Sequence, residues 1–241
     1  MPAPVKALLL AAGLGTRLRP LTDTLPKCLV PIAGKPLIDY WFDALERAGV
    51  SEVVLNTHHL PDVMRAHLEK ARASRSLVIR ESYEPKLLGS AGTVHANRAL
   101  AAGAEEVLIV YADNLSSVDL GELVSFHRSH SDPVTMLLFH TPYPKQCGIA
   151  ALDGEGRVVE FVEKPEHPKS DLANGGLYVV DASIYREMAD RNVFDIGFDI
   201  LPTFVGRMRG FRFDGYHRDM GNLAAVEQAQ IDAPRYFEKR A

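Results

Sequence analysis

The chain has 241 residues, of which 46% are hydrophobic and 24% are charged, and its formal net charge is −4. This length suits one well-buried α/β domain and is short for two full-sized ones, so we expect a single domain over residues 1–241. Because the chain has no basic excess, we do not expect a nucleic-acid-binding protein, and any phosphate site must be local.

The first half of the chain alternates between predicted strands and predicted helices. The first helix, for example, places its apolar residues on one stripe and ends at Gly49. The predicted strands are 5–10, 52–56, 77–80 and 106–111, and the predicted helices are 37–49, 61–71, 91–101 and 119–130. Such alternation predicts an α/β fold in which helices cover both faces of a parallel sheet.

The second half reads as shorter strands separated by turn residues. We expect strands at 134–140, 148–152, 158–163, 175–180 and 210–214, and helical segments at 183–189, 197–205 and 222–233. The turn at 153–156, with the sequence DGEG, predicts a hairpin between the second and third of these strands.

The loop after the first strand combines small residues with two cations. The small residues are Ala11, Ala12, Gly13 and Gly15, and they allow backbone N–H groups to turn onto an anion. Arg17 and Lys27 can then face the same charge, which predicts a polyphosphate site. A dinucleotide-binding loop fits poorly, since Leu18 occupies the place of its third glycine.

The run G-x-G-T-R, which includes Thr16 and ends at Arg17, together with the following Pro26-Lys27 pair, resembles the sugar-1-phosphate nucleotidyltransferases. The likeness is greatest to the short mannose- or heptose-1-phosphate guanylyltransferases and the amino-sugar-1-phosphate uridylyltransferases. It implies a three-layer α/β/α Rossmann-like sandwich with a mostly parallel mixed sheet, GT-A-like. It also implies a nucleotide-binding half over 1–130 and a sugar-phosphate-binding half over 131–241.

Two aspartates match the metal ligands of this family. Asp113 follows the strand 106–111 in VYADN, where Ala112 replaces the usual glycine, and Asp219 lies in GYHRDMGN, where His217 replaces the usual tryptophan. The resemblance implies that both carboxylates hold Mg²⁺, a hard cation that prefers oxygen ligands. Read by themselves, Asp113 could begin a turn and Asp219 could lie ahead of a helix cap.

The resemblance also implies a sugar side and a base side. Glu163 and Lys164 match an E-K-P motif, and Asn174 and Gly148 match sugar-binding positions, although Cys147 stands where relatives carry an aromatic residue. The implied catalytic residues are Arg17, Lys27 and Lys164; the nucleotide-binding residues Ala11, Ala12, Gly13, Gly15, Thr16, Glu81, Gly89 and Asp113; the sugar-binding residues Gly148, Glu163 and Asn174; and the metal ligands Asp113 and Asp219.

The implied reaction joins a nucleoside triphosphate to a sugar 1-phosphate and releases pyrophosphate, by in-line attack with Mg²⁺. We expect GTP and a mannose or heptose 1-phosphate, because the acidic residues Glu81 and Glu84 before the LGSAG loop resemble the guanylyltransferases. A uridylyl- or thymidylyltransferase for a hexose or amino-sugar 1-phosphate is the alternative. A second alternative is a non-catalytic nucleotide-sugar-binding regulator.

The remaining expectations concern location and partners. Cys28 and Cys147 are too few for a disulfide framework, and the N-terminal apolar run is too short for a signal peptide. We expect a cytoplasmic enzyme, a monomer or small homo-oligomer, without nucleic-acid or membrane partners. Lys27 next to Cys28 is expected to lower the pKa of that thiol and to make it sensitive to thiol reagents.

Overall fold

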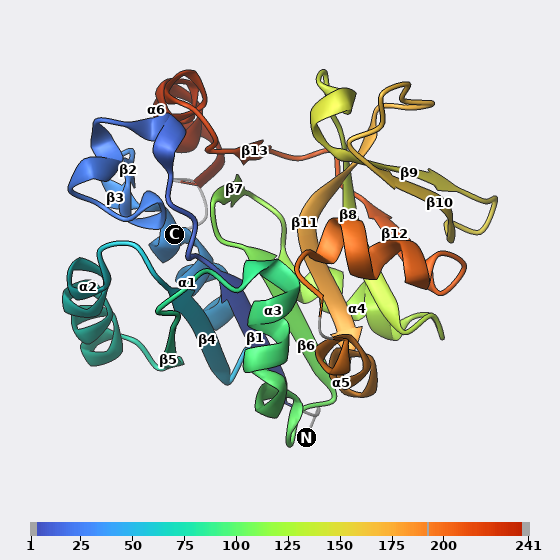
Figure 1. The fold of residues 1–241 in the computed structure, drawn as a ribbon, viewed down its shortest axis with the longest axis horizontal. Helices are drawn as coiled ribbons and strands as arrows, with labels where there is room; N and C mark the ends of the chain where they lie inside the picture. The colour runs from blue at the N-terminus through green and yellow to red at the C-terminus, as the bar shows by residue number, and fades with distance from the viewer. Residues whose placement is uncertain (1–3, 192, 238–241) are drawn as a thin grey trace. The chain divides into compact units, whose positions relative to one another are not determined.

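A computed structural model describes residues 4–191 and 193–237, which form two compact units (Figure 1). Unit 1 comprises residues 4–6, Leu88–Val110 and Gly121–Asp214, and unit 2 comprises Ala7–Leu87, Tyr111–Leu120 and residues 215–237. Both units draw on residues from either side of position 130, and the division into a nucleotide-binding half and a sugar-phosphate-binding half stays a prediction. A single domain over the whole chain stays a prediction.

Unit 2 contains the strand and helix alternation expected near the N-terminus. Its strands are β1 (Val5–Leu10), which begins in unit 1, β4 (Glu52–Thr57) and β5 (Val78–Tyr83), in the order β1-β4-β5. Strands β4 and β5 run parallel, with Val53 opposite Ile79. The connecting helices are α1 (Leu37–Arg47) and α2 (Pro61–Ser74), and the C-terminal helix is α6 (Leu223–Phe237).

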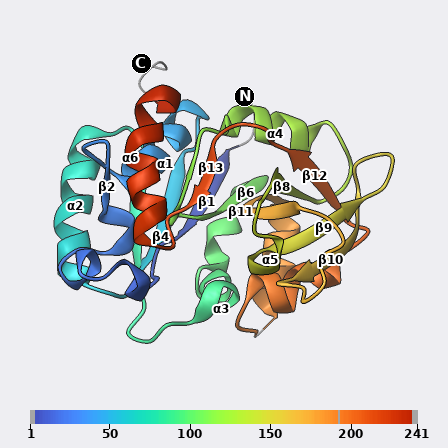
Figure 2. The same ribbon diagram turned by 90° about the horizontal axis from the view of Figure 1, so that it is seen from above.

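Short strand pairs complete unit 2. The hairpin of β2 (Pro31–Ile32) and β3 (Lys35–Pro36) follows the loop after β1, and β7 (Asn114–Ser116) pairs antiparallel with β13 (His217–Asp219). One face of α6 packs against this region (Figure 2). The buried cluster consists of Leu18, Val30, Ile32, Leu37, Leu115, Tyr216, Met220, Val226, Ala229 and Ala233. This cluster fixes the loop after β1 and the β7–β13 pair on one support.

Unit 1 is built around β11 (Leu172–Asp181), which pairs antiparallel with β6 (Glu106–Tyr111), β8 (Val134–His140) and β9 (Gly148–Leu152). Strand β10 (Val158–Glu163) pairs with β9, which confirms the hairpin expected from the DGEG turn. Strand β12 (Met208–Arg212) pairs parallel with β8. The helices are α3 (Gly89–Ala96), α4 (Leu120–Arg128), whose first residue lies in unit 2, and α5 (Ala182–Asp190), followed by a π-helical turn (Ile196–Ile200) and a 3₁₀ turn (Leu201–Phe204). The α/β class is confirmed.

Helix α3 differs most from its sequence prediction. It starts at Gly89 rather than near residue 91, and after Ala96 the chain continues as a 3₁₀ turn over Arg98–Ala101. Tertiary contacts explain the early start, because the Ala91 N–H donates to the Phe194 carbonyl over 3.1 Å. Gly89 has φ +75°, and a Cβ there would collide with the same carbonyl. A local pattern cannot reveal a helix start that depends on residue 194.

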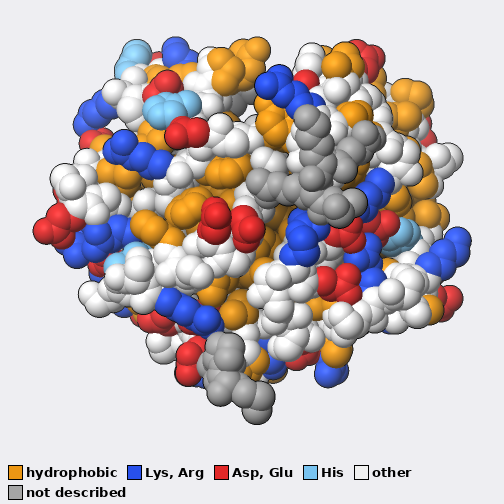
Figure 3. Space-filling model, turned by 180° about the vertical axis from the view of Figure 1, so that it is seen from behind, with side chains coloured by type: hydrophobic (Ala, Val, Ile, Leu, Met, Phe, Trp, Pro, Cys, Tyr) orange, Lys and Arg blue, Asp and Glu red, His pale blue; other side chains and the backbone are white. Residues whose placement is uncertain are grey.

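No helix within the described ranges is long and apolar enough to cross a membrane. On the face shown in Figure 3, Lys and Arg side chains are interspersed with Asp and Glu. This mixture agrees with the formal net charge of −4, and the absence of a nucleic-acid partner stays a prediction.

Asp132 is the structural carboxylate whose removal we expect to destabilise the protein. It is buried in unit 1 and accepts hydrogen bonds from Arg157 Nε at 3.0 Å and Arg209 Nε at 2.8 Å. Burial acts to raise the pKa of Asp132, but these two hydrogen bonds hold it below its usual value. Asp132→Asn should lower the free energy of unfolding by about 3 kcal/mol at pH 7, because two guanidinium groups lose their counter-charge.

This destabilisation should depend on pH. A carboxylate with a lowered pKa stabilises the fold above its unfolded pKa of about 4, and that contribution is lost as the pH falls through the folded pKa. The difference between wild type and Asp132→Asn in urea unfolding should therefore be large at pH 7 and smaller near pH 3. An equal difference at both values would show that the Asp132 charge is not the cause.

Candidate active site

The loop after β1 is held in a conformation that requires glycine at position 15. Gly15 has φ +63°, and a Cβ there would lie 2.8 Å from Thr22 Cγ2 and 3.1 Å from Lys27 Cβ. The Thr22 hydroxyl donates to the Gly15 carbonyl over 2.8 Å, and buried Leu18 anchors the following 3₁₀ turn. Gly13, Thr16 and Arg17 remain exposed. The loop is therefore fixed at one end while its polar groups face outward.

Asn56, at the carboxyl end of β4, occupies two of the N–H groups that we expected to face an anion. Its Oδ1 accepts from the Ala11 N–H at 2.6 Å and from the Ala12 N–H at 3.2 Å. In this structure these two N–H groups donate to Asn56 instead of facing outward, and a nucleotide contact by Ala11 and Ala12 stays a prediction. Asn56 instead shapes the start of the loop, and its Nδ2 donates to buried Glu84 at 2.9 Å.

The pairing of β7 with β13 brings together two aspartates that lie far apart in the sequence. In its register Asp219 is opposite Asn114, the residue after Asp113, and the Met220 N–H donates to the Asp113 carbonyl over 3.0 Å. Helix α1 supports the β7–β13 pair, since Trp41 Nε1 donates to the Asn114 carbonyl over 2.8 Å. The β7–β13 pair thus places both carboxylates in unit 2 beside the loop that carries Lys27.

Lys27 lies between these carboxylates. Its side chain is only 8% exposed, and its Nζ donates to Asp113 Oδ2 at 2.7 Å and to Asp219 Oδ1 at 3.4 Å. Although the Asp219 side chain is half-exposed, its surroundings in the site partly desolvate the carboxylate and raise its pKa; the charge of Lys27 opposes that rise, and Asp113 adds to it. One buried cation facing two carboxylates is a compact charged site.

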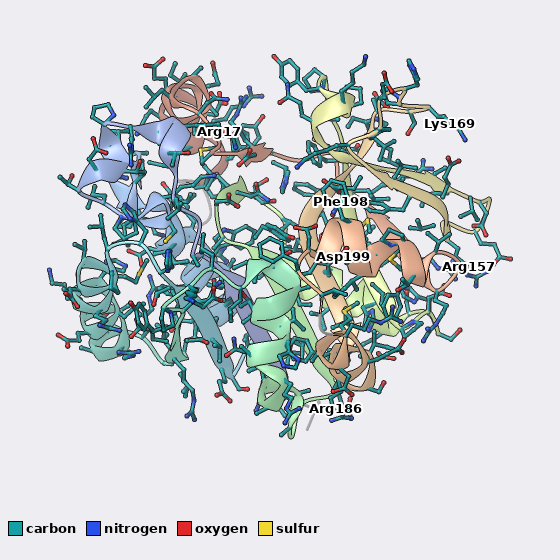
Figure 4. The ribbon with its side chains drawn as sticks, viewed as in Figure 1. Arg17, Arg157, Lys169, Arg186, Phe198 and Asp199 are labelled. Atoms are coloured by element: carbon teal, nitrogen blue, oxygen red, sulfur yellow. The ribbon has the colours of Figure 1, made fainter. Side chains whose placement is uncertain are left out.

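Arg17, labelled in Figure 4, lies on the loop after β1, and its charge acts on Asp219 of the same site. At position 221 a Cβ would lie 2.5 Å from Asp219 Oδ2 and 3.1 Å from Arg17 Nη2. Glycine at 221 therefore leaves room for the carboxylate and the guanidinium to converge. The four residues that sequence reasoning grouped as phosphate and metal ligands, Arg17, Lys27, Asp113 and Asp219, all meet in unit 2.

The donor set suits a hard divalent cation. No group of three or more His, Cys, Asp or Glu residues with metal-binding geometry occurs in residues 4–191 and 193–237. Asp113 and Asp219, with side chains 36% and 58% exposed, nevertheless keep carboxylate oxygens accessible. Mg²⁺ is commonly bound by one or two carboxylates, water and substrate phosphates, so this pair fits such an ion.

Glu81 is placed differently from its expected role beside a nucleobase. Its carboxylate accepts from the Thr57 hydroxyl at 2.6 Å and from Arg65 Nε at 2.9 Å, and its side chain is 16% exposed. Glu84 is buried as well. Both acidic side chains thus serve the interior of unit 2, and a base contact by Glu81 stays a prediction.

The prediction that Cys28 carries a reactive thiol of lowered pKa is wrong. The side chain is buried, and desolvation raises the pKa of the thiol to about 12, which outweighs the opposite effect of the Lys27 charge. We therefore expect Cys28 to react slowly with thiol reagents.

In unit 1, Glu163 lies in a tight, mostly buried position at the end of β10. Its side chain is 14% exposed. A Cβ at position 148 would collide with Glu163 Oε2, and a Cβ at position 197 would lie 2.8 Å from the same atom. Two glycines, Gly148 and Gly197, therefore make room for this carboxylate. Burial raises the pKa of Glu163, and the Lys164 charge acts in the opposite direction.

Lys164 follows with a strained backbone, since its φ is +49°. Its Nζ lies 3.9 Å from Glu163 Oε1, its side chain is 56% exposed, and its N–H donates to the Cys147 carbonyl. A left-handed conformation costs a non-glycine residue about 1 kcal/mol or more, and such strain often occurs at functional sites. Unit 1 thus presents a carboxylate and an ammonium group side by side.

Asn174 is engaged internally. Its Nδ2 donates to the Tyr178 hydroxyl at 2.7 Å, and its Oδ1 accepts from the Gly176 N–H at 2.9 Å, at an irregularity in the pairing of β11 with β8. A sugar contact by Asn174 stays a prediction.

Sequence reasoning missed Asn56 and Gly197. Their signals were weak, namely a polar residue at the end of an apolar strand and a glycine inside a helical segment.

Comparisons with known proteins show the family of the chain. A family model described as "Nucleotidyl transferase" matches residues 6–235. The chain is similar to a mannose-1-phosphate guanylyltransferase of Mycobacterium tuberculosis (33% identical over 96% of this chain and 65% of that protein). It is also similar to a mannose-1-phosphate guanyltransferase of Schizosaccharomyces pombe (32%, over 90% and 61%) and a glucose-1-phosphate adenylyltransferase of Thermosipho africanus (31%, over 96% and 62%). The chain thus spans less than two thirds of the length of these relatives.

A solved structure confirms the fold. It is a Bacillus anthracis protein, crystallised with sucrose, whose description names glucose-1-phosphate thymidylyltransferase. The TM-score is 0.84, with 95% of each chain covered, and the sequence identity is 23%. The architecture implied by the G-x-G-T-R resemblance is therefore the one that this chain adopts.

Proposed function

Since the chain belongs to the nucleotidyl transferase family, we propose that it transfers a nucleotidyl group from a nucleoside triphosphate to a sugar 1-phosphate. The observation that carries the proposal is the convergence of Arg17, Lys27, Asp113 and Asp219 in unit 2. Two reacting polyanions need positive charge beside them. Arg17 and Lys27 supply such charge, and the two carboxylates could hold a metal cation that adds to it.

The reaction needs no activated nucleophile, because a sugar phosphate is already an anion at neutral pH. One of its oxygens attacks the α-phosphorus of the triphosphate, a new P–O bond forms, and the bond to the bridging oxygen of the β-phosphate breaks. Pyrophosphate leaves with that electron pair. Arg17 and Lys27 neutralise negative charge on the phosphates. Because both cations lie on a fixed loop, less entropy is lost when the triphosphate is oriented for attack.

Asp113 and Asp219 would hold Mg²⁺, which when bound screens the phosphates from each other. Lys27 keeps the two carboxylates close together, since its ammonium group contacts both. On unit 1, Lys164 supplies a point charge suited to the phosphate of the sugar, and Glu163 supplies an acceptor suited to hydroxyl groups.

For the substrates we propose GTP and mannose 1-phosphate or a related heptose phosphate. The relatives from Mycobacterium tuberculosis and Schizosaccharomyces pombe are described as mannose-1-phosphate guanylyltransferases, which supports this choice. The relative from Thermosipho africanus is described as acting with adenylyl groups and glucose 1-phosphate, which makes ATP the comparison to include. Cytoplasmic localisation and a monomeric or small oligomeric state stay predictions.

A substrate panel tests the proposal. Pyrophosphate release is measured for GTP, ATP, UTP, dTTP and CTP, each with mannose, glucose, N-acetylglucosamine and heptose 1-phosphates. We expect release to require both substrates and to be fastest with GTP and a mannose-type phosphate. If no pair releases pyrophosphate while calorimetry still detects nucleotide binding, the chain is a binding protein instead.

Lys164→Ala should weaken use of the sugar phosphate. Loss of a charge-assisted contact to phosphate costs about 1.5 to 3 kcal/mol, so kcat/KM for the sugar 1-phosphate should fall by about 10- to 100-fold. Calorimetric affinity for the triphosphate should change little. Lys169→Ala is the matched control, because Lys169 is 77% exposed and pairs with Glu160 at 2.7 Å. Equal losses for both substrates in Lys164→Ala would contradict the assignment.

A further inference from the structure

Phe198 is an exposed aromatic residue on a rigid segment of unit 1. Figure 4 labels Phe198 on this segment. Phe198 is 56% exposed, whereas Ile196 and Ile200 on the same turn are buried. Monomeric proteins often expose single apolar residues, so exposure alone means little. The π-helical turn that carries Phe198, however, belongs to a class that occurs often at functional sites.

The hydrogen bonds around this turn hold it in one position. Asp195 Oδ1 accepts from the Phe198 N–H at 3.0 Å, and Asp199 Oδ2 accepts from the Phe194 and Asp195 N–H groups at 3.1 and 2.8 Å. Ser90 at the start of α3 accepts from the Ile196 N–H and donates to Asp195 Oδ2. A side chain on such a turn is presented with little loss of backbone entropy when a ligand binds.

The same turn lies against Glu163 and Lys164. Gly197 packs closely on the Glu163 carboxylate, since a Cβ at position 197 would lie 2.8 Å from Glu163 Oε2. Lys164 Nζ lies 5.7 Å from the centre of the Phe198 ring, which is within the range of a cation–π contact. The Phe198 ring therefore lies beside the ammonium group that we assign to the phosphate of the sugar.

Three kinds of surface meet at this place in unit 1. The Glu163 carboxylate can accept hydrogen bonds from hydroxyl groups, the Lys164 ammonium can bind a phosphate, and the Phe198 ring offers an apolar face. A hexose 1-phosphate has the complementary set, namely hydroxyl groups, a phosphate and an apolar face of C–H bonds.

We propose that Phe198 is a sugar-binding residue, whose ring packs on the apolar face of the sugar beside Lys164, which binds the phosphate. This inference rests on the proposed function, because it names a residue of the same sugar 1-phosphate site. It assigns to Phe198 a contribution to sugar affinity and not to the chemical step.

The test compares three variants at position 198. Phe198→Ala should raise KM for the sugar 1-phosphate about five- to tenfold, since an aromatic packing contact is worth about 1 kcal/mol, with kcat nearly unchanged. Phe198→Tyr should keep wild-type KM, and Phe198→Leu should fall between, because it keeps apolar area but loses the cation–π contact. Calorimetric titration of mannose 1-phosphate should show the same order without turnover.

Phe194→Ala is the matched control, because Phe194 is also exposed, at 63%, and lies on the same segment. It should leave KM for the sugar 1-phosphate within about twofold of wild type. An unchanged KM in Phe198→Ala, or an equal rise in Phe194→Ala, overturns the proposal. A loss of triphosphate affinity in Phe198→Ala, with sugar affinity intact, would overturn it in favour of base stacking. Wild-type protein that turns over no sugar 1-phosphate would instead defeat the proposed function.

Discussion

Replacement of Asp113 or of Asp219 by asparagine is expected to lower kcat/KM by about 10³-fold. Charge stabilisation by a bound metal ion is worth several kcal/mol, and a neutral amide is a poorer ligand for a hard cation than a carboxylate. Both aspartates contact Lys27, so each variant also leaves this buried ammonium with a single carboxylate. Steady-state kinetics at several Mg²⁺ concentrations measure the effect.

The control is Asp23→Asn, because Asp23 is a half-exposed carboxylate on the loop after β1 and pairs only with exposed Arg19 in the described part of the chain. It should keep nearly full activity. Circular dichroism and thermal unfolding of all three variants show whether the fold persists. If Asp113→Asn or Asp219→Asn keeps wild-type turnover at saturating Mg²⁺, that residue serves only as an ion-pair partner of Lys27.

Arg17→Ala is expected to lower kcat by about 10², with a smaller change in KM for the triphosphate. Loss of one preorganised electrostatic contact to the transition state has this size in enzymes that stabilise developing negative charge. Arg17 is exposed and lies near Asp219, so its removal should leave the stability of unit 2 almost unchanged. The measurement is kcat and KM for both substrates, together with a thermal unfolding curve.

Arg19→Ala is the control for this variant. Arg19 lies two residues further along the same loop, is 66% exposed and pairs with Asp23 at 3.2 Å. Its removal should change neither kcat nor KM by more than about twofold, in line with the small effect of exposed ion pairs. A rise in KM alone after loss of Arg17, with kcat preserved, would contradict this prediction. It would show that Arg17 binds the substrate and the transition state equally well.

Local patterns predicted the main elements because periodicity reports burial. Strands β1, β6, β8, β9 and β10 have the predicted bounds. The apolar stripe of α1, including Trp41 and Phe42, is buried as expected. Asp113 was found because a carboxylate stands two residues after the apolar strand β6, whereas the roles of Arg17 and Lys27 rested on the small-residue loop after β1 and on the family resemblance.

The β7–β13 pair could not be predicted in this way. Each strand has three residues, which is too few for a period to appear, and each depends on a partner far away in the sequence. The resemblance suggested that Asp113 and Asp219 share a metal ion, but only the pairing explains how they meet. The division into two units could not be predicted for the same reason. Each unit combines stretches that lie far apart in the sequence, and long-range contacts define them.

Internal hydrogen bonds account for the remaining differences. The N–H groups of Ala11 and Ala12 read as free donors in a small-residue loop, yet Asn56 accepts from both. Cys28 read as activated by its neighbour Lys27, but burial outweighs that charge. In each case the deciding contact or burial comes from tertiary packing that the local residue pattern does not contain.

The most direct test of nucleotidyl transfer follows a radioactive label from the α- or the γ-phosphate of GTP into the products. Wild-type protein is incubated with Mg²⁺, mannose 1-phosphate and GTP labelled at either the α- or the γ-phosphate, and the products are separated. We predict that the α-label enters a nucleotide sugar and the γ-label enters pyrophosphate, in equal amounts and only when the sugar phosphate is present. Appearance of the γ-label as orthophosphate, with no α-label in a sugar product, would contradict nucleotidyl transfer.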